Sequence, residues 1–479
     1  MVIVRKVRIL WKTARTLCCG HVTFDADVRS FYDAERGHRG FVCVCIIMII
    51  HIYLNSRLTL KKQEIYIMKK NISFVCAAGL LLCSFGAFAK SKKPSAPYVI
   101  EEFAPDKVNR QLGYQLTGDG STVVFVFDAG AYGIKVPKKV YVEGSFNGWA
   151  KGTSADWQLE PYKGNIWTLT CDAEDVKVPG NSGFPEFKFY VVADVEYVTT
   201  ICGKEVTRTR QEKMEPAAVS RIPGFQMATN NLILFPGDDP AVVVENVKVS
   251  ERVKKLKEFD LSNPDDCATI SNVRVVPGTS KLIRGYHPYK ISRANFNTEK
   301  TRLELVNKAI EDNGVQSIIT LSGNEQIISG KETISSYIQN INYSGNHLFI
   351  DTSYNTVYYN STGSDFGKLM ADIISFINTH PGPYYIHCRL GTDRTGVTSA
   401  VLAALCGASW DEIRADYQKT NAMGIKEFRD YRLLQYSFEK MLGKPMDEVQ
   451  NLQKELGNYF IERKFVTQAD LDTLVSRLK

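Results

Sequence analysis

One segment constrains the fold of this chain most: a short apolar strand that runs straight into a loop and an apolar helix. Residues 384–387 are aromatic or apolar except for the final His, and residues 395–405 form a largely apolar run of helical length. Strands that are buried on both faces belong to parallel sheets covered by helices. The segment therefore predicts an α/β domain in which residues 388–394 join a central strand to its helix.

The same alternation of strands and helices extends over residues 265–479. Residues 298–313 are expected to form a helix, and residues 315–321 and 347–350 are expected to form strands. Between residues 366 and 377, apolar side chains recur at helical spacing on a single face. This region is therefore predicted to be a mainly parallel sheet with helices on its faces.

Residues 113–240 follow a different rhythm. Short segments rich in Val, Ile and aromatic residues are separated by Gly, Pro, Asn and Asp, which predicts an antiparallel, immunoglobulin-like β-sandwich. Residues 241–264 change to Asp/Pro and then to Lys/Glu, and are predicted to be a linker with a solvated helix. The expected strands are residues 123–127, 139–143, 166–169, 186–192 and 231–235.

Charge is unevenly distributed along the chain. Residues 1–89 contain 13 Lys/Arg and 5 Asp/Glu, whereas the other 390 residues contain 46 and 47. The formal net charge of +7 therefore comes from the first segment. The rest of the chain is nearly neutral, so no nucleic-acid partner is expected.

The first 112 residues read as a leader followed by a tether. Residues 68–89 combine a charged start, an uncharged run and a final Ala-Phe-Ala, which is typical of a secretory signal peptide cleaved near Ala89. Residues 1–67 are then an upstream extension that is not native, and residues 90–112 are a Lys/Ser/Pro-rich tether. The alternatives are an N-terminal anchor at residues 41–54 and lipid attachment at Cys83. The prediction is a secreted or periplasmic protein whose mature chain has no membrane span.

Five cysteines remain after the predicted cleavage site, too few for a disulfide scaffold in 390 residues. Pairing between Cys171 and Cys202 is left open. The mature chain contains no CxxC, no HExxH and no cluster of histidines. We therefore expect neither a metal nor a cofactor.

The loop that follows the strand has the composition of a phosphate-binding site. Residues 387–396 read His-Cys-Arg-Leu-Gly-Thr-Asp-Arg-Thr-Gly. Amide N–H groups of such a loop and of the following helix N-terminus can surround an anion, and Gly391 is expected to let the backbone turn close to it. The side chain of Arg394 can hold two phosphoryl oxygens side by side. The expected phosphate-binding residues are Arg389, Leu390, Gly391, Thr392, Asp393 and Arg394.

The same field would lower the pKa of the Cys388 thiol and supply a thiolate near neutral pH. That thiolate can attack phosphorus and form a cysteinyl-phosphate, which water then hydrolyses. Thr395 is expected to donate a hydrogen bond to the leaving thiolate in the second step. His387 is expected to brace the loop rather than to transfer protons.

This pattern, HCxxGxxRTG at a strand-to-helix junction, resembles the cysteine-dependent tyrosine and dual-specificity phosphatase superfamily. Residues 281–285 (Lys-Leu-Ile-Arg-Gly) and 410–417 (Trp-Asp-Glu-Ile-Arg-Ala-Asp-Tyr) resemble conserved segments of its atypical, bacterial-type members. The resemblance covers residues 270–479 and implies a metal-free phosphatase. The alternative is a loop that binds an anion without turnover.

The leaving group needs a proton, so a general acid should stand within reach of it. Asp393 lies inside the loop, where related lipid phosphatases have a proposed acid, and Asp351 follows the expected strand 347–350. Asp365 heads a helix and is more typical of a cap. Asp351 and Asp393 are equal candidates, and Asp393 has the alternative role of bracing the loop.

The N-terminal region has its own resemblance. Residues 142–149 (Val-Glu-Gly-Ser-Phe-Asn-Gly-Trp) resemble a motif of family 48 carbohydrate-binding modules, as do segments around residues 187–191 and 230–234. In glycogen-binding members an indole stacks on glucose, with a Lys, a second aromatic and an Asn nearby. The alternative is a structural partner that binds no sugar. The resemblance implies a sugar site made of Trp149, Lys188, Tyr197 and Asn231.

Together these features predict an exported phosphatase of the tyrosine or dual-specificity type. Its substrate would be a phosphoprotein, a phosphoglucan or an inositol phosphate. A sugar module joined to such a domain is similar to glycogen phosphatases, so a polysaccharide is a second expected partner. Arg389 would favour anionic substrates. The rival prediction is a sugar- or protein-binding adaptor whose phosphatase loop is idle.

Overall fold

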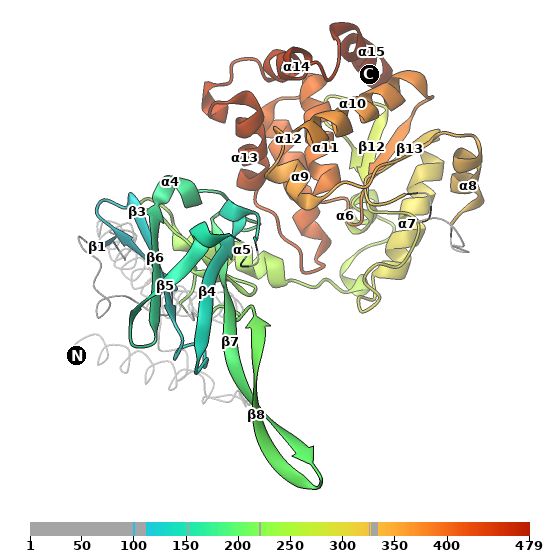
Figure 1. The fold of residues 1–479 in the computed structure, drawn as a ribbon. Coiled ribbons are helices and arrows are strands. Elements are labelled where there is room, and N and C mark those ends of the chain that lie inside the picture. Colours follow the sequence, from blue (N-terminus) through green and yellow to red (C-terminus); the bar gives the residue numbers. More distant parts are fainter. Residues whose placement is uncertain are drawn as a thin grey trace, which may run out of the picture. The chain divides into compact units, whose positions relative to one another are not determined.

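The computed structural model describes residues 99–100, 112–150, 152, 154–219, 222–324, 326 and 334–479. The predicted upstream extension and signal peptide, and most of the tether, lie outside these residues. The β-rich and α/β regions belong to one compact unit, Lys93–Lys479, and all contacts below lie within it (Figure 1). Within the described part of the chain, no helix combines the length and apolar character needed to cross a membrane.

The N-terminal region, here called the β-domain, is built on a single, strongly curled sheet (Figure 1). Its strand order is β1-β2-β3-β6-β5-β4-β7-β10-β9, with β8 paired to β7, and all pairs except β1–β2 are antiparallel. The predicted antiparallel strands are present. A two-sheet, immunoglobulin-like sandwich stays a prediction, because β5 pairs with both β4 and β6 and joins the halves. The strands are β1 Val99–Ile100, β2 Tyr114–Thr117, β3 Thr122–Asp128, β4 Pro137–Gly144, β5 Gln158–Lys163, β6 Ile166–Asp172, β7 Glu186–Ile201, β8 Lys204–Met214, β9 Gln226–Met227 and β10 Asn230–Leu232.

Alternating side chains along the strands form the core of the β-domain. In β7, Phe187, Phe189 and Val191 are fully buried, whereas the residues between them are partly exposed. Helix α5 (Pro240–Glu251) lies in the predicted linker, starts at the N-cap Asp239 and adds the buried Val243 to this core. The short helices of the domain are η3 Ser145–Asn147, η4 Ala155–Trp157 and α4 Ala173–Val176.

Strands β7 and β8 continue as a two-stranded hairpin beyond the sheet (Figure 1). The last residue of β7 that pairs with β4 is Ala193, and from there to Ile201 the strand pairs only with β8. Cys202 is exposed in the turn of this hairpin, whereas Cys171 is partly buried in β6. Both thiols are free, so the pairing left open from the sequence does not form in this structure.

The C-terminal region, the α/β domain, contains a five-stranded sheet in the order β11-β12-β15-β13-β14. All neighbours are parallel except β11 and β12, which confirms the predicted sheet type. Successive residues of the central strand β15 face opposite sides: Tyr384 and Ile386 join one apolar cluster, and Tyr385 joins the other. The strands are β11 Arg274–Val275, β12 Leu282–Gly285, β13 Ser317–Thr320, β14 His347–Phe349 and β15 Tyr384–His387.

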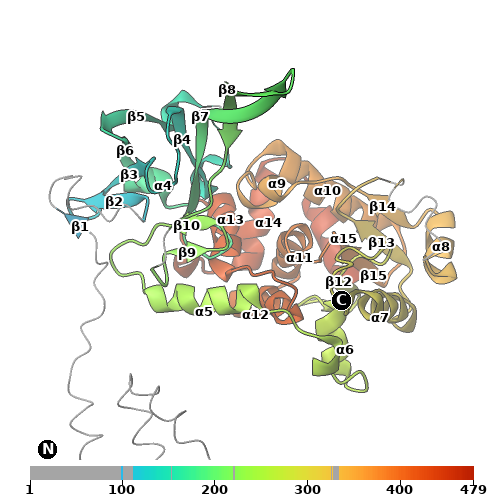
Figure 2. The same ribbon diagram turned by 90° about the horizontal axis from the view of Figure 1, so that it is seen from below.

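Helices cover both faces of this sheet (Figure 2). The amphipathic segment predicted over residues 366–377 lies in α10, whose apolar face is buried as expected. Helix α11 follows β15 after six loop residues, and all its residues after Arg394 are buried. The helices are α6 Pro264–Ser271, α7 Glu299–Asp312, α8 Ser336–Tyr343, α9 Tyr354–Tyr358, α10 Ser364–Thr379, α11 Arg394–Leu405, α12 Trp410–Gln418, α13 Tyr431–Leu442, α14 Leu452–Glu462 and α15 Gln468–Leu478, with short helices η5 Leu256–Glu258, η7 Lys419–Met423 and η8 Met446–Glu448.

Candidate active site

The candidate site lies where the central strand ends. His387, the last residue of β15, pairs with Gly285 of β12 on one side and with Thr320 of β13 on the other. The carboxyl ends of three parallel strands therefore meet at one edge of the sheet, the usual position of a binding site in this fold class. Residues 388–393, here called the phosphate loop, leave this edge and enter α11 at Arg394.

Hydrogen bonds from outside hold the carbonyl groups of the phosphate loop. The carbonyl of Leu390 accepts a bond from Asn272 Nδ2 at 3.0 Å, and that of Gly391 accepts one from Arg284 Nη2 at 2.7 Å. The Cys388 carbonyl lies 3.0 Å from His387 Nδ1. In a trans peptide the N–H points away from the C=O. Carbonyls turned toward the outside therefore leave the following amides facing the inside of the loop, as anion binding requires.

Gly391 combines a tight turn with a close approach. Its φ is +72°, which agrees with the predicted turn of the backbone at this residue. A Cβ added there would lie 2.2 Å from the carbonyl oxygen of Gly285. The end of β12 therefore gives a second reason for glycine at this position.

Cys388 and Thr395, the predicted nucleophile and the predicted partner of the leaving thiolate, lie at the two ends of the phosphate loop. Cys388 is 2% exposed at the start of the loop. Thr395 is fully buried in the first turn of α11, and its hydroxyl has no hydrogen-bond partner among the described residues. Thr392 Oγ1, also buried, lacks a described partner as well. Because buried polar groups are normally paired, these hydroxyls mark a place where a polar ligand would supply the missing partner.

His387 belongs to a buried polar network. Its Nε2 lies 2.8 Å from Thr320 Oγ1 and 3.1 Å from the hydroxyl of Tyr289, and His347 Nε2 lies 2.9 Å from each of the same two oxygens. Burial lowers the pKa of His387 to about 4 and that of His347 to about 3. Both imidazoles are therefore neutral near pH 7. This geometry agrees with a bracing role for His387.

Arg394 is anchored through one nitrogen. Its Nη1 donates to the carbonyls of Leu321 and Thr352, at 3.2 and 3.3 Å. Its Nε and Nη2 make no hydrogen bond to a described residue, so this edge of the guanidinium is available to a phosphoryl group. Arg389, in contrast, is exposed and donates from Nε to Ser292 Oγ at 2.7 Å.

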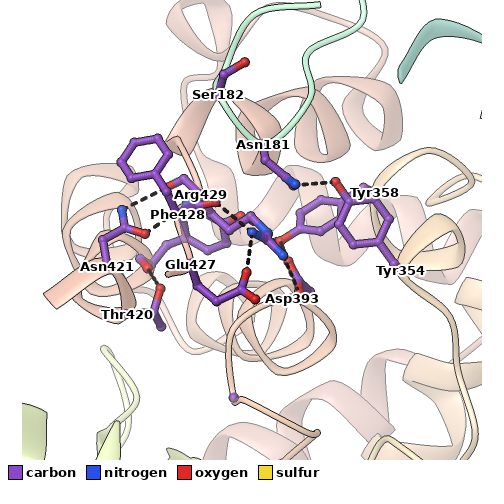
Figure 3. Close-up of polar contacts among 12 residues, drawn as sticks. Asn181, Ser182, Tyr354, Tyr358, Asp393, Thr420, Asn421, Glu427, Phe428 and Arg429 are labelled. Atoms are coloured by element: carbon purple, nitrogen blue, oxygen red, sulfur yellow. Dashed lines mark hydrogen bonds and ion pairs between the residues drawn. The ribbon is translucent and has the colours of Figure 1, made fainter. Parts of the chain in front are cut away.

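Asp393 is held by several donors. Arg429 Nε and Nη2 contact its two carboxylate oxygens at 2.6 and 3.1 Å, and the Tyr358 hydroxyl donates to Oδ1 at 3.2 Å (Figure 3). Both carboxylate oxygens are thus occupied by donors of the surrounding structure. Because neither oxygen is left to face a leaving group, the geometry favours the bracing role of Asp393 over the general-acid role.

The other two aspartates differ in their relation to the loop. Asp351 is exposed and forms an isolated bridge with Ser322, and the next residue, Thr352, contacts Arg394. Asp365 is exposed in the first turn of α10, whose N-cap is Gly363, so it is not the cap itself. Asp351 is thus next to Thr352, which binds the loop arginine Arg394. Among the described residues, Asp351 forms no ion pair, and it is the candidate of the three that meets both conditions.

A buried ion-pair network was not assigned from the sequence. Arg284 is 1% exposed and donates from Nη1 to Asp416 Oδ2 at 2.8 Å, while its Nη2 holds the Gly391 carbonyl. Asp416 also accepts from Arg274. Burial opposes ionisation of Asp416, but the two arginines hold the pKa of its carboxyl below the usual value. Arg284 and Asp416 lie in residues 281–285 and 410–417, the two segments that resemble the superfamily. That resemblance was the one sequence signal that could have pointed to the pair.

The four residues of the predicted sugar site do not all lie together in the described structure, and sugar binding stays a prediction. Asn231 pairs with the core-facing Phe187 and is 1% exposed, so it faces the interior. Lys188 follows Phe187 and therefore faces the opposite side of the strand. Tyr197 is nine residues further along β7, roughly 30 Å away at about 3.3 Å per residue, and Arg210 lies over its ring.

Trp149 lies just after η3 near the end of β4. Its amide donates to the Gly144 carbonyl at 3.0 Å. The Trp149 side chain is partly exposed, and its φ is +61°.

Comparison with known proteins gives a family match and a structural match for the C-terminal region. The model of a tyrosine phosphatase family matches residues 290–478. The core catalytic domain of the PP-IP phosphatase SIW14 from S. cerevisiae, solved in complex with citrate, is similar with 14% identity and a TM-score of 0.24, over 41% of this chain and 94% of that chain. No curated protein matches the sequence. The family match supports a phosphatase domain of the cysteine type over residues 290–478.

Proposed function

We propose that this chain hydrolyses phosphate monoesters of the phosphotyrosine or dual-specificity class through a cysteinyl-phosphate intermediate. The observation that carries the proposal is the phosphate loop itself. Its carbonyls are held outward at residues 388, 390 and 391, and Cys388 lies at its start. Such a loop stabilises both the substrate phosphate and the thiolate.

The reaction has two displacement steps. In the first, Cys388 Sγ attacks phosphorus, the P–O bond to the alcohol or phenol breaks, and the leaving oxygen takes a proton from Asp351. In the second, water gives a proton to the Asp351 carboxylate and attacks the phosphocysteine, the P–S bond breaks, and Cys388 leaves as a thiolate while inorganic phosphate is released. The Thr395 hydroxyl donates a hydrogen bond to the departing thiolate. Arg394 binds two phosphoryl oxygens throughout.

Loss of the nucleophile is the direct test. The chain from Lys90 onward should release phosphate from para-nitrophenyl phosphate, vanadate should inhibit the release, and Cys388→Ser should lower kcat by roughly 10³-fold or more. Cys406→Ser is the matched control, because this buried cysteine follows α11 at its far end. Absence of vanadate-sensitive turnover by the wild type between about pH 5 and 8 would refute the proposal.

A substrate panel separates the three predicted substrate classes. A phosphotyrosine peptide and inositol phosphates are comparable candidates, and the substrate with the highest kcat/KM identifies the class. Arg389 is exposed and donates to Ser292 Oγ, so a cation of the loop faces outward where it can meet further negative charge on a substrate. The phosphoglucan alternative relies on a sugar site whose four predicted residues do not all lie together.

The rival function is an adaptor that binds a phosphorylated or sugar ligand without turnover. An adaptor would bind tungstate, a phosphate mimic, equally well in wild type and Cys388→Ser, and neither would release phosphate. An enzyme would show turnover that only the wild type supports. We also propose export, on the basis of the leader pattern in residues 68–89; cleavage after Ala89 in a bacterial host, read by mass spectrometry, would test it.

A further inference from the structure

A short segment links the phosphate loop to the β-domain. Residues 427–430, here called the strap, lie between η7 and α13. Asn421 fixes the backbone of the strap, because its side chain accepts from the Arg429 amide at 2.9 Å and donates to the Arg429 carbonyl at 3.0 Å (Figure 3). These two bonds fix the backbone of the strap, and the contacts that its two faces make depend on that position.

One face of the strap holds the phosphate loop. Arg429 forms the fork to Asp393 and also donates from Nη1 to Glu427 Oε2 at 3.0 Å. Burial opposes its charge, but the two carboxylates keep the pKa of Arg429 well above its usual value. Asp393 is the residue that precedes Arg394, so its position sets the end of the loop and the first turn of α11.

The other face of the strap packs into the β-domain. Phe428 is 6% exposed and belongs to the apolar core of that domain. The Asp430 amide donates to the Asn181 carbonyl at 2.9 Å, and Asn246 Nδ2 donates both to Asp430 Oδ2 at 3.2 Å and to the Ser182 carbonyl at 3.1 Å. Residues on both sides of Arg429 are thus fixed by the β-domain.

A second path reaches the same carboxylate. The Tyr354 hydroxyl donates to Asn181 Oδ1 at 2.8 Å, and its ring packs on Tyr358 with centroids 4.8 Å apart. The Tyr358 hydroxyl in turn donates to Asp393. Asn181 therefore contacts both paths, one through its side chain and one through its carbonyl group.

We propose that Arg429 is a positioning residue for the phosphate loop, acting through Asp393, and that the β-domain loop at Asn181 holds the strap in place. The β-domain is then part of the structure that orients the loop. This inference rests on the proposed phosphatase function for its kinetic consequence. That the strap orients the phosphate loop does not depend on turnover.

The Asp393–Arg429 pair is tested with leaving groups of different acidity. Asp393→Asn and Arg429→Met should each lower kcat/KM about 30-fold, and the double variant should fall no further, because the two residues act as a unit. The fall should be equal for para-nitrophenyl phosphate and phenyl phosphate. If Asp393 were the general acid, its removal would reduce turnover of phenyl phosphate far more, because that leaving group needs the proton. Arg429→Lys should recover part of the loss, because Lys keeps the charge but not the fork.

The β-domain contact is tested in the full chain. Asn181→Leu and Asn246→Leu replace amides with side chains of similar size, and each should lower kcat/KM about 3- to 10-fold, which lies within the range for residues that couple two sites. Val198→Ala, on the exposed hairpin of the same domain, is the control and should leave kcat/KM unchanged. Wild-type values in both interface variants would overturn the β-domain part of the inference.

Tungstate binding separates this inference from the proposed function. In a Cys388→Ser background, calorimetry should show about 5- to 10-fold weaker tungstate binding for Arg429→Met, with partial recovery for Arg429→Lys. If the wild type shows no turnover but binding follows this order, the proposed function fails and the inference stands. If the wild type turns over substrate and Arg429→Met equals it in both assays, the inference fails and the function stands.

Discussion

Substitutions in the buried pair of Arg284 and Asp416 should affect stability and activity to different extents. Arg284→Met removes the bond to the Gly391 carbonyl but leaves Asp416 paired with Arg274. Asp416→Asn removes the negative partner of two arginines, one fully buried and one nearly so. The first change acts on the phosphate loop, and the second leaves buried positive charge uncompensated.

The magnitudes follow from these contacts. Breaking a buried ion pair by removing one partner costs about 3–5 kcal/mol, so Asp416→Asn should lower the free energy of unfolding by that amount. Arg284→Met loses a charged hydrogen bond and leaves one carbonyl unpaired, but it buries an apolar side chain of similar length. About 2 kcal/mol is expected for it. Its kcat should nevertheless fall further than that of Asp416→Asn, because the Gly391 carbonyl is released.

Urea unfolding and para-nitrophenyl phosphate kinetics on the same samples provide the assay. A shift of the urea midpoint at an unchanged m-value measures the change in stability. The value of kcat at saturating substrate measures how well the phosphate loop still supports turnover. Arg414→Met, on the exposed face of α12, is the matched control. An Arg284→Met variant with unchanged kcat, or one that is less stable than Asp416→Asn, would refute the reasoning.

Three further outcomes are expected. Gly391→Ala should abolish turnover and cost several kcal/mol of stability, because its Cβ would overlap the Gly285 carbonyl. Gly443→Ala is the control, because Gly443 also has a positive φ but open space around it. Equal effects of the two substitutions would contradict the overlap argument. The folded-state pKa of His387, lowered to about 4, means that the unfolded chain binds more protons between about pH 4 and 6.5, so stability should fall as pH drops through that window. His387→Gln should flatten the slope of unfolding midpoint against pH there, and an unchanged slope would count against it. Asp351→Asn should lower kcat for phenyl phosphate about 10²-fold and for para-nitrophenyl phosphate much less; equal losses would remove Asp351 as the acid.

Local sequence was sufficient for the parts of the fold that neighbouring residues define. The strand, loop and helix at residues 384–405 are contiguous, so apolar runs and the loop composition predicted their order and the position of Cys388. The amphipathic pattern of α10 was equally local. The mainly parallel sheet followed from the alternation of such elements.

The roles inside the site depended on partners far away in the chain. Asp393 looked equally suited to acid and brace until Arg429, 36 residues later, was found to hold both of its oxygens. Arg284 and Asp416 are 132 residues apart, and no pattern in either segment states that they touch. Which donors surround a carboxylate is decided by the tertiary fold, and the sequence alone does not specify it.

The placement of the predicted sugar-site residues depended on distant pairing in the same way. A motif match placed Lys188 and Asn231 in one group, but the register between β7 and β10 puts Asn231 opposite the buried Phe187. Successive residues of a strand alternate between its two faces, and this follows from the sequence. Which of the two faces is buried depends on how the strands pair and curl. The chain's sequence thus determined its elements and its reactive loop, and only the tertiary pairing of distant residues decided which side chains meet there.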